Sequence, residues 1–444
     1  MHLFNRFFFA LPLLLAPWLY GTTEPWSRAL VNFLCWIPTL LVLFELRSLS
    51  RFRVRRPVLL AVLIPLAALL LWQATHPVQV RIVGQDAGLA FTPARPATPF
   101  TSNAAITSMF LWSWGSFALY GLALLHHLRT YDDARFFLRL FVLNGSALGL
   151  VGLLMYFSGT DLLLWVRKPR FGGEIFGPYV CRNNFAACVN LFVPLALGAA
   201  VLPSLIPSSG HQEIPQRFLW AFAGALMIAS VVCSASRAGF LVTALVTAVV
   251  AVDSALRGFS RGGRARAGPP PRRWPLLMLL LLVAAMVIFA GESMRVLGRF
   301  GAEGGVDNVR EIVYRNTLKA MPGSPFFGYG LGTFPPLFFA FQPLTLPYYW
   351  NHTHNDWLQA LFETGAVGLG LVSLFLALAL GTLLKERFTE ESNFRRSLVS
   401  VGTIALAGCL LHAVVDFPLQ IPSIQLTFVT LLALSLSSRY LKDE

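Results

Sequence analysis

The chain has 444 residues, of which 56% are hydrophobic and only 13% are charged. This composition excludes an ordinary soluble protein and predicts a polytopic membrane protein. The formal net charge of +14 does not indicate a nucleic-acid partner, because no segment is polar enough to form such a domain; unequal positive charge on the two sides of a membrane accounts for most of it.

Apolar runs long enough to cross a membrane alternate with polar breaks, which predicts an all-α fold of about twelve transmembrane helices. The predicted spans are 4–22, 29–46, 57–74, 105–125, 139–157, 185–202, 218–233, 238–253, 275–291, 363–384, 397–415 and 424–438. The first lacks a small-residue cleavage site, so we interpret it as an uncleaved helix. The chain then divides into an N-terminal bundle (1–291), a large loop (292–362) and C-terminal helices (363–444).

Most of the 35 Lys and Arg residues fall in loops that share one side if both termini are cytoplasmic. The basic segments 47–56 and 254–274 dominate this asymmetry, and the glycines and prolines of the second predict a flexible linker. Most outer cations are concentrated in the loop before 185–202, the turn 234–237 and the loop 292–356. Short outer loops normally carry few arginines, so this pattern indicates an anionic partner.

Two of these outer positions lie at predicted helix starts. In Cys181-Arg182-Asn183-Asn184, an asparagine can cap the helix, and Arg182 meets the positive end of the helix dipole, where an anion is favoured. In Ser234-Ala235-Ser236-Arg237, Ser236 can cap a helix or help to bind an anion. The alternative for each arginine is a side chain that extends to the membrane interface. Cysteines adjoin both motifs, at Cys181 and Cys233, but their spacing does not predict a disulfide.

The large loop contains a predicted amphipathic helix around Arg310–Lys319. The sequence Gly328-Tyr329-Gly330-Leu331-Gly332 is similar to a phosphate-binding loop, but it follows no strand, so we interpret it as a turn. Residues 334–350 combine prolines and aromatic side chains, which suits an interfacial lid or a stacking surface for sugar rings.

The loop ends in Asn351-His352-Thr353-His354-Asn355-Asp356, an unusual concentration of polar side chains in an apolar protein. Thr353, Asn355 or Asp356 can cap the following helix. A histidine here can instead act as a proton acceptor, because imidazole titrates near neutral pH. A metal site formed by His352, His354 and Asp356 is a third possibility, but the set lacks further ligands and the chain contains no Asp-x-Asp motif.

Arginines and a histidine on one face together fit one kind of chemistry. The planar guanidinium suits a diphosphate, and a diphosphate leaves readily once its developing charge is stabilised. A neutral histidine can take the proton of an attacking hydroxyl group.

These segments resemble the O-antigen ligase/polymerase superfamily, over about residues 170–425 and in the order found in that family. The motifs are Arg182-Asn183-Asn184-Phe185-Ala186, then Ser234-Ala235-Ser236-Arg237-Ala238-Gly239, then Arg310 with Tyr314 and the glycine segment 328–332, and finally His352-Thr353-His354-Asn355 through Gly365 and Gly368. Tyr314 stands where the family more often has Trp.

The resemblance implies a GT-C-like glycosyltransferase of the bacterial inner membrane with a partly helical periplasmic loop, without a cofactor or required metal. It implies transfer of a glycan from undecaprenyl diphosphate to an acceptor hydroxyl, with inversion at the anomeric carbon. Arg182 and Arg237, with Arg310 third, would bind the diphosphate, and His354 would be the base. We further expect His352, Asn355 and Asp356 to orient that base. His412 and Asp416, four residues apart on one helix face, can support the site or form a local pair.

The acceptor is not identified by these motifs. An O-antigen ligase uses a sugar of the lipid A-core, a polymerase uses another lipid-linked repeat unit, and a protein O-glycosylating transferase uses a protein hydroxyl. We favour the ligase. A transporter of lipid-linked oligosaccharides would need ionisable residues deep within the spans, and a structural scaffold would not explain the clustered outer arginines.

Overall fold

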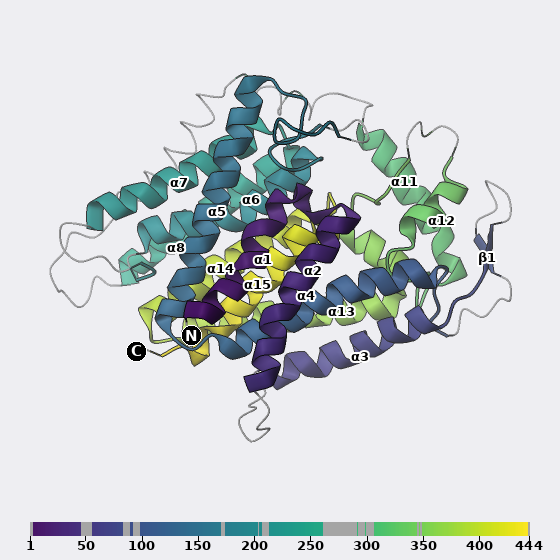
Figure 1. Cartoon of the computed structure of the whole chain (residues 1–444), viewed down its shortest axis with the longest axis horizontal. Coiled ribbons are helices and arrows are strands. Elements are labelled where there is room, and N and C mark those ends of the chain that lie inside the picture. Colours follow the sequence, from purple (N-terminus) through teal and green to yellow (C-terminus); the bar gives the residue numbers. More distant parts are fainter. Residues whose placement is uncertain are drawn as a thin grey trace.

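The computed structural model describes residues 3–45, 56–82, 89–91, 98–169, 174–202, 204–206, 213–260, 291, 298, 306–343, 346 and 349–442. This part of the chain is a bundle of long helices (Figure 1). Nine of its helices are long and apolar enough to cross a membrane. They are α2 (Pro25–Glu45), α3 (Pro57–Thr75), α4 (Ala104–His127), α5 (Tyr131–Ser158), α6 (Arg182–Val201), α7 (Glu213–Cys233), α8 (Arg237–Ser260), α13 (Asp356–Thr389) and α14 (Asn393–His412).

The predicted count of twelve spans is not confirmed. The predicted spans 4–22 and 424–438 correspond to α1 (Leu3–Trp18) and α15 (Pro422–Ser437), of 16 residues each, which is short of the ~20 residues that a span usually needs. After α1 the chain turns at Gly21, where φ is +65°, and α15 begins only after the turn at Pro418–Gln420. The predicted span 275–291 lies outside the described residues, apart from Gly291.

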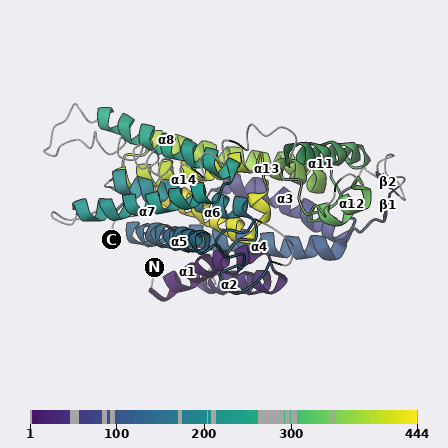
Figure 2. The same cartoon turned by 90° about the horizontal axis from the view of Figure 1, so that it is seen from above.

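Helix α6 lies at the centre of the bundle, in contact with α5, α7, α8, α14 and α15 (Figure 2). Every residue from Asn184 to Val201 is buried. Small residues allow this close packing: a Cβ atom at Gly198 would lie 2.3 Å from Val401 of α14. Helices from both halves of the chain thus share one core, and the predicted division at residues 291 and 362 remains a prediction.

Both termini lie at one end of the bundle, which we call the inner end (Figures 1 and 2). The opposite, outer end carries α11 (Val306–Ala320), α12 (Phe334–Phe341) and the short antiparallel strands β1 (Val80–Ile82) and β2 (Leu89–Phe91). The amphipathic helix predicted around Arg310 is therefore confirmed as α11. The aromatic side chains of α12 form a second core with Phe362 of α13, so Phe334, Phe338 and Phe341 are buried rather than available to sugar rings.

Helix α13 is interrupted at Gly365, where φ is +66° and ψ is −173°. Segment 325–330 pairs with the interrupted backbone: the Gly330 N–H donates to the Glu363 carbonyl at 2.8 Å, and the Ala366 N–H donates to the Pro325 carbonyl at 2.9 Å. A Cβ atom at Gly365 would lie 2.3 Å from the Phe326 backbone, so only glycine fits this close approach. The glycine segment 328–332 is thus a turn, as predicted, and it fixes the outer loop to α13.

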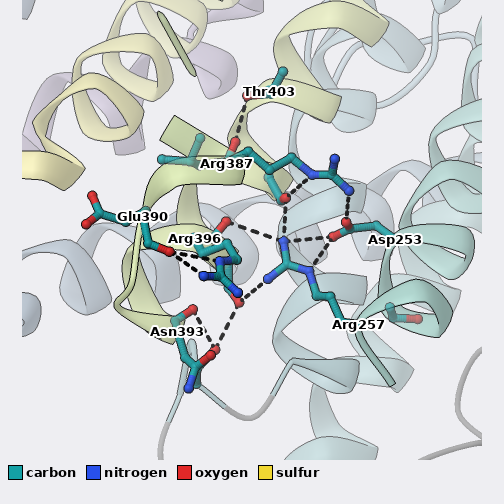
Figure 3. Close-up of polar contacts among 12 residues, drawn as sticks. Asp253, Arg257, Arg387, Glu390, Asn393, Arg396 and Thr403 are labelled. Atoms are coloured by element: carbon teal, nitrogen blue, oxygen red, sulfur yellow. Dashed lines mark hydrogen bonds and ion pairs between the residues drawn. The ribbon is translucent and has the colours of Figure 1, made fainter. Parts of the chain in front are cut away.

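At the inner end, one polar network joins α8, α13 and α14 (Figure 3). Asp253, which is 4% exposed, forms ion pairs with Arg257 at 3.0 Å and with Arg387. Arg257 also donates to Ser397 and Ser400 of α14, at 3.0 and 2.5 Å. Because α8 continues to Ser260, Arg257 belongs to this helix and not to the predicted linker 254–274, most of which lies outside the described residues. The basic segment 47–55 is also outside them.

Candidate functional site

The polar segment 351–355 at the outer end leads directly into α13. The Asn355 side chain accepts a hydrogen bond from the Leu358 N–H at 3.0 Å and caps the helix. His354 precedes this cap in a left-handed conformation, with φ of +57°. The capping interpretation of the segment is therefore correct, and it leaves the His354 side chain available for another role.

The His354 ring pairs with Asp416, which follows α14. Its Nδ1 lies 3.1 Å from Asp416 Oδ1, and the Asp416 side chain is 1% exposed whereas that of His354 is 22% exposed. When Nδ1 carries the proton and donates a hydrogen bond to the carboxylate, Nε2 keeps its lone pair. The pair can therefore hold a histidine base in one tautomer and stabilise it once it is protonated.

Asp416 receives three further contacts from different parts of the chain. The Asn183 amide donates to its Oδ2 at 2.5 Å, the Phe417 N–H donates to Oδ1 at 3.0 Å, and the Arg310 guanidinium lies 3.7 Å from Oδ2. Burial acts to raise the pKa of Asp416, but the hydrogen bond from His354 and the nearby positive charges outweigh it and lower this pKa below its usual range. The carboxylate therefore stays ionised.

Two of the predicted anion-binding arginines begin neighbouring helices. Arg182 is the first residue of α6 and Arg237 the first of α8. The two helix starts touch, because the Asn190 amide of α6 donates to the Gly239 carbonyl of α8 at 3.0 Å, and a Cβ atom at Gly239 would lie 2.4 Å from that of Ala186. Both arginines thus start helices at the outer end, where helix N-termini favour an anion.

The third arginine, Arg310 on α11, contacts the loop after α14. It donates to the Val415 carbonyl at 3.0 Å and lies beside Asp416, as described above. Arg182 forms an ion pair with Glu174, whose side chain is 66% exposed. Of the predicted set, Arg310 contacts Asp416 directly and Arg182 precedes Asn183, which contacts it, whereas Arg237 starts the neighbouring helix α8. Each arginine also has protein contacts of its own.

Other predicted supporting residues have different partners from those expected. The ring of His354 is bonded by Asp416 and not by His352, Asn355 or Asp356. Asp356 accepts a hydrogen bond from the Leu419 N–H at 2.8 Å, which ties the start of α13 to the turn after α14. Asn355 serves as the cap. These two residues position the segment rather than the ring.

His352 stacks on Phe417, with ring centroids 4.3 Å apart, and His354 meets the same ring edge-on at 4.7 Å. The His352 Nδ1 lies 3.2 Å from Gln359 Oε1. Burial, with a smaller contribution from the charge of His354, lowers the pKa of His352 to about 3. His352 is thus neutral in this arrangement, and it shares the Phe417 ring with His354.

Two further predicted residues are also placed. Ser236 accepts a hydrogen bond from the Gly239 N–H at 3.1 Å and caps α8. The ring nitrogens of His412, which is 1% exposed, have no hydrogen-bond partner in the described structure. No disulfide joins Cys181 to Cys233 in the part of the chain that is described. The described residues contain no cluster of three or more potential metal ligands.

Sequence reasoning missed one polar chain that links the site to the glycine turn. The Gln359 amide donates to Glu363 Oε1 at 3.0 Å, and Glu363 Oε2 accepts from the Gly332 N–H at 2.8 Å. Gln359 also contacts His352, so segment 351–355 and the turn 328–332 are held by the same stretch of α13. The spacing of Gln359 and Glu363, four residues apart on one helix face, was the available signal.

Taken together, the long apolar helices and the polar site at one end define a multi-pass membrane protein. Residues 222–373 match the model of the O-antigen ligase family, which confirms the resemblance to the O-antigen ligase superfamily. The matched segment is about a third of the chain and contains Arg237, Arg310 and His354, whereas Arg182 and Asp416 lie outside it. No curated protein matches the chain significantly.

Proposed function

We propose that this protein is an O-antigen ligase-type inverting glycosyltransferase. It moves a glycan from undecaprenyl diphosphate to a hydroxyl of a lipid A-core sugar at the periplasmic face of the bacterial inner membrane. The observation that carries the proposal is the His354–Asp416 pair at the outer end, which contacts Arg310 directly and the start of α6 through Asn183, the residue after Arg182. The family match over residues 222–373 supports the same class of reaction.

In the proposed reaction, His354 Nε2 takes the proton of the acceptor hydroxyl while its oxygen attacks the anomeric carbon of the donor. The bond between that carbon and the diphosphate oxygen breaks, and undecaprenyl diphosphate leaves with the bonding electrons. Attack from the face opposite the leaving group inverts the anomeric centre. Asp416 stabilises the histidinium that forms.

Arg182 and Arg237, with Arg310, would bind the diphosphate and offset the negative charge that develops on it. Guanidinium groups and helix N-termini supply positive charge without a metal ion, so we propose a reaction that does not depend on a metal. We also propose the GT-C-like architecture on the basis of the same resemblance.

The placement of charges favours this enzyme over a transporter. The ion pairs among the described residues lie at the two ends of the bundle. Arg6–Asp133 and Arg257–Asp253 are examples at the inner end, and Arg310–Asp416 is one at the outer end. A transport pathway for a charged lipid-linked sugar is expected to place ionisable groups near the middle of the membrane.

The test uses purified protein in detergent with an undecaprenyl-diphosphate-linked glycan, offered lipid A-core in one tube and only more donor in another. Product on lipid A-core alone would establish a ligase, and a ladder of lengthened lipid-linked glycan would establish a polymerase instead. His354→Ala is the matched control. No product in either tube, with wild type equal to His354→Ala, would contradict a glycosyltransferase function.

A further inference from the structure

Arg28 is a second kind of outer arginine, distinct from the predicted anion-binding set. It lies in the first turn of α2, and its guanidinium packs over the ring of Phe110 of α4 at 4.9 Å. Its Nε is buried and has no hydrogen-bond partner in the described structure. Glu24, one helical turn earlier, is not its counter-ion, because Glu24 pairs with Arg167 at 3.1 Å. Arg28 thus carries a positive charge without a carboxylate partner among the described residues.

The cleft around Arg28 contains further unmet polar groups. It is lined by Arg28, Phe110, Ser113, Trp114, Gln420, Pro422 and Gln425. Trp114 Nε1 and Gln420 Oε1 have no hydrogen-bond partner in the described part of the chain, and Gln420 is only 7% exposed. Buried polar groups are normally paired, and leaving one unpaired costs ~1–3 kcal/mol. The cleft is too narrow to enclose a water molecule, so a ligand group would bind at its mouth.

This cleft adjoins the proposed catalytic pair. Gln420 ends the short helical turn Pro418–Gln420, four residues after Asp416, so their backbones are at most ~14 Å apart. Arg28 is also close enough for its charge to contribute, after burial and His354, to the lowered pKa of His352. Gln420 links the cleft to the site, because its N–H donates to the Phe417 carbonyl at 3.1 Å and the Phe417 ring stacks on His352. Arg310 and Asn183 contact the site elsewhere, at Asp416.

We propose that Arg28 binds an anionic group, a phosphate or a carboxylate, carried by the acceptor glycan. The proposal rests on the proposed glycosyltransferase function, in which Arg182, Arg237 and Arg310 serve the donor. A guanidinium stacked on an aromatic ring keeps its N–H edge available for two parallel hydrogen bonds to such a group. From the mouth of the cleft, the guanidinium would thus orient a charged acceptor beside His354.

The test measures acceptor and donor KM separately for Arg28→Gln, with full-length protein in phosphatidylcholine vesicles. Three acceptors are compared: an intact anionic oligosaccharide, the same with its phosphates removed, and the same with its carboxylates reduced. We expect Arg28→Gln to raise the KM of the intact acceptor at least about tenfold, as for loss of a charged hydrogen bond of ~1.4 kcal/mol or more, without a change in donor KM. Removing the recognised group from the acceptor should raise the acceptor KM of wild type by the same factor. It should not raise the acceptor KM of Arg28→Gln any further.

Two variants control for folding and charge. Arg28→Lys keeps the charge without the fork and should give an intermediate acceptor KM. Arg315→Gln removes an outer arginine of α11 that already has a carboxylate partner, Glu311 at 2.5 Å, and it should leave acceptor KM unchanged. An unchanged acceptor KM in Arg28→Gln, an increase confined to donor KM, or an equal loss for charged and uncharged acceptors would each overturn the proposal.

A phospholipid headgroup is the alternative source of the anion. If a headgroup occupies the cleft, phosphatidylglycerol vesicles will stabilise wild type but not Arg28→Gln. Wild type and Arg28→Gln will then have the same acceptor KM. That result would overturn an acceptor site. If wild type transfers no glycan at all, the proposed function fails. Equilibrium dialysis then measures whether the phosphorylated oligosaccharide binds wild type more tightly than Arg28→Gln. Binding at least about tenfold weaker in Arg28→Gln would support the site, and equal binding would overturn it.

Discussion

The two ends of the bundle each hold a buried aspartate among arginines, yet they differ in what remains available. At the inner end, Asp253 pairs with Arg257 and Arg387, and serine hydroxyls take up further N–H groups (Figure 3). At the outer end, Asp416 holds one nitrogen of His354 and leaves the ring 22% exposed. The inner network is satisfied within the protein and stabilises helix packing. The outer pair retains a base that can act on a substrate.

The comparison is tested most strongly by Asp416→Asn. The amide can present its N–H group to His354 Nδ1 and favour the wrong tautomer, so kcat should fall about 10²–10⁴-fold with little change in donor KM. Steady-state transfer to a fixed acceptor measures this. A kcat within threefold of wild type would show that Asp416 does not support the base.

Substitutions at Arg182 and Arg237 should have the next largest effect. Changing either to Ala is expected to reduce donor kcat/KM by about 10–100-fold, because a charge-assisted hydrogen bond is worth ~1.5–3 kcal/mol. Lys should restore part of the loss, since it keeps the charge but not the planar fork. Equal losses for Ala and Lys would indicate that geometry rather than charge determines donor binding.

Asp253→Asn should affect stability rather than transfer. It leaves Arg257 and Arg387 without their carboxylate, and breaking a buried pair costs about 3–5 kcal/mol; because the two guanidinium groups are partly exposed, we expect the lower part of that range. Thermal unfolding in detergent measures the loss, while kcat per folded molecule should stay within threefold of wild type. A large loss of kcat at unchanged stability would make the inner network part of the catalytic machinery.

The smallest expected effect is a pH dependence due to His352. Its pKa is lowered to about 3 in the folded protein and is ~6.5 when exposed, so the unfolded chain binds the extra proton between these values. His352 therefore favours folding above pH ~6.5, and this advantage is lost as the pH falls toward 3. The Tm should fall less steeply from pH 7 to 5 in His352→Gln than in wild type. Equal slopes would remove His352 as the cause.

The sequence predicted most helices and the residues of the site, but not their pairings. Arg182, Arg237 and His354 stand in short motifs that can be recognised locally. The His354–Asp416 contact joins residues 62 positions apart, and it depends on how α13 and α14 pack. Asp416 therefore received only a supporting role, and neighbours of His354 in sequence were expected to orient it.

Two other differences have local causes. Apolar content predicted that the span starting at 238 would end at 253, but α8 continues to Ser260, and Arg257 in this added turn pairs with Asp253. Arg28 was missed because a single arginine at the start of a span is typical of a side chain that extends to the interface. Only the structure places it beside Phe110 and Gln420.

His354 is tested as the general base by the single-turnover rate of glycan transfer by His354→Ala, with donor bound and lipid A-core in excess. We expect a rate at least about 100-fold below wild type, because the general base is lost, with Tm and donor binding nearly unchanged. A rate within a few-fold of wild type would contradict the assignment of His354 as the base and the functional contrast between the two ends.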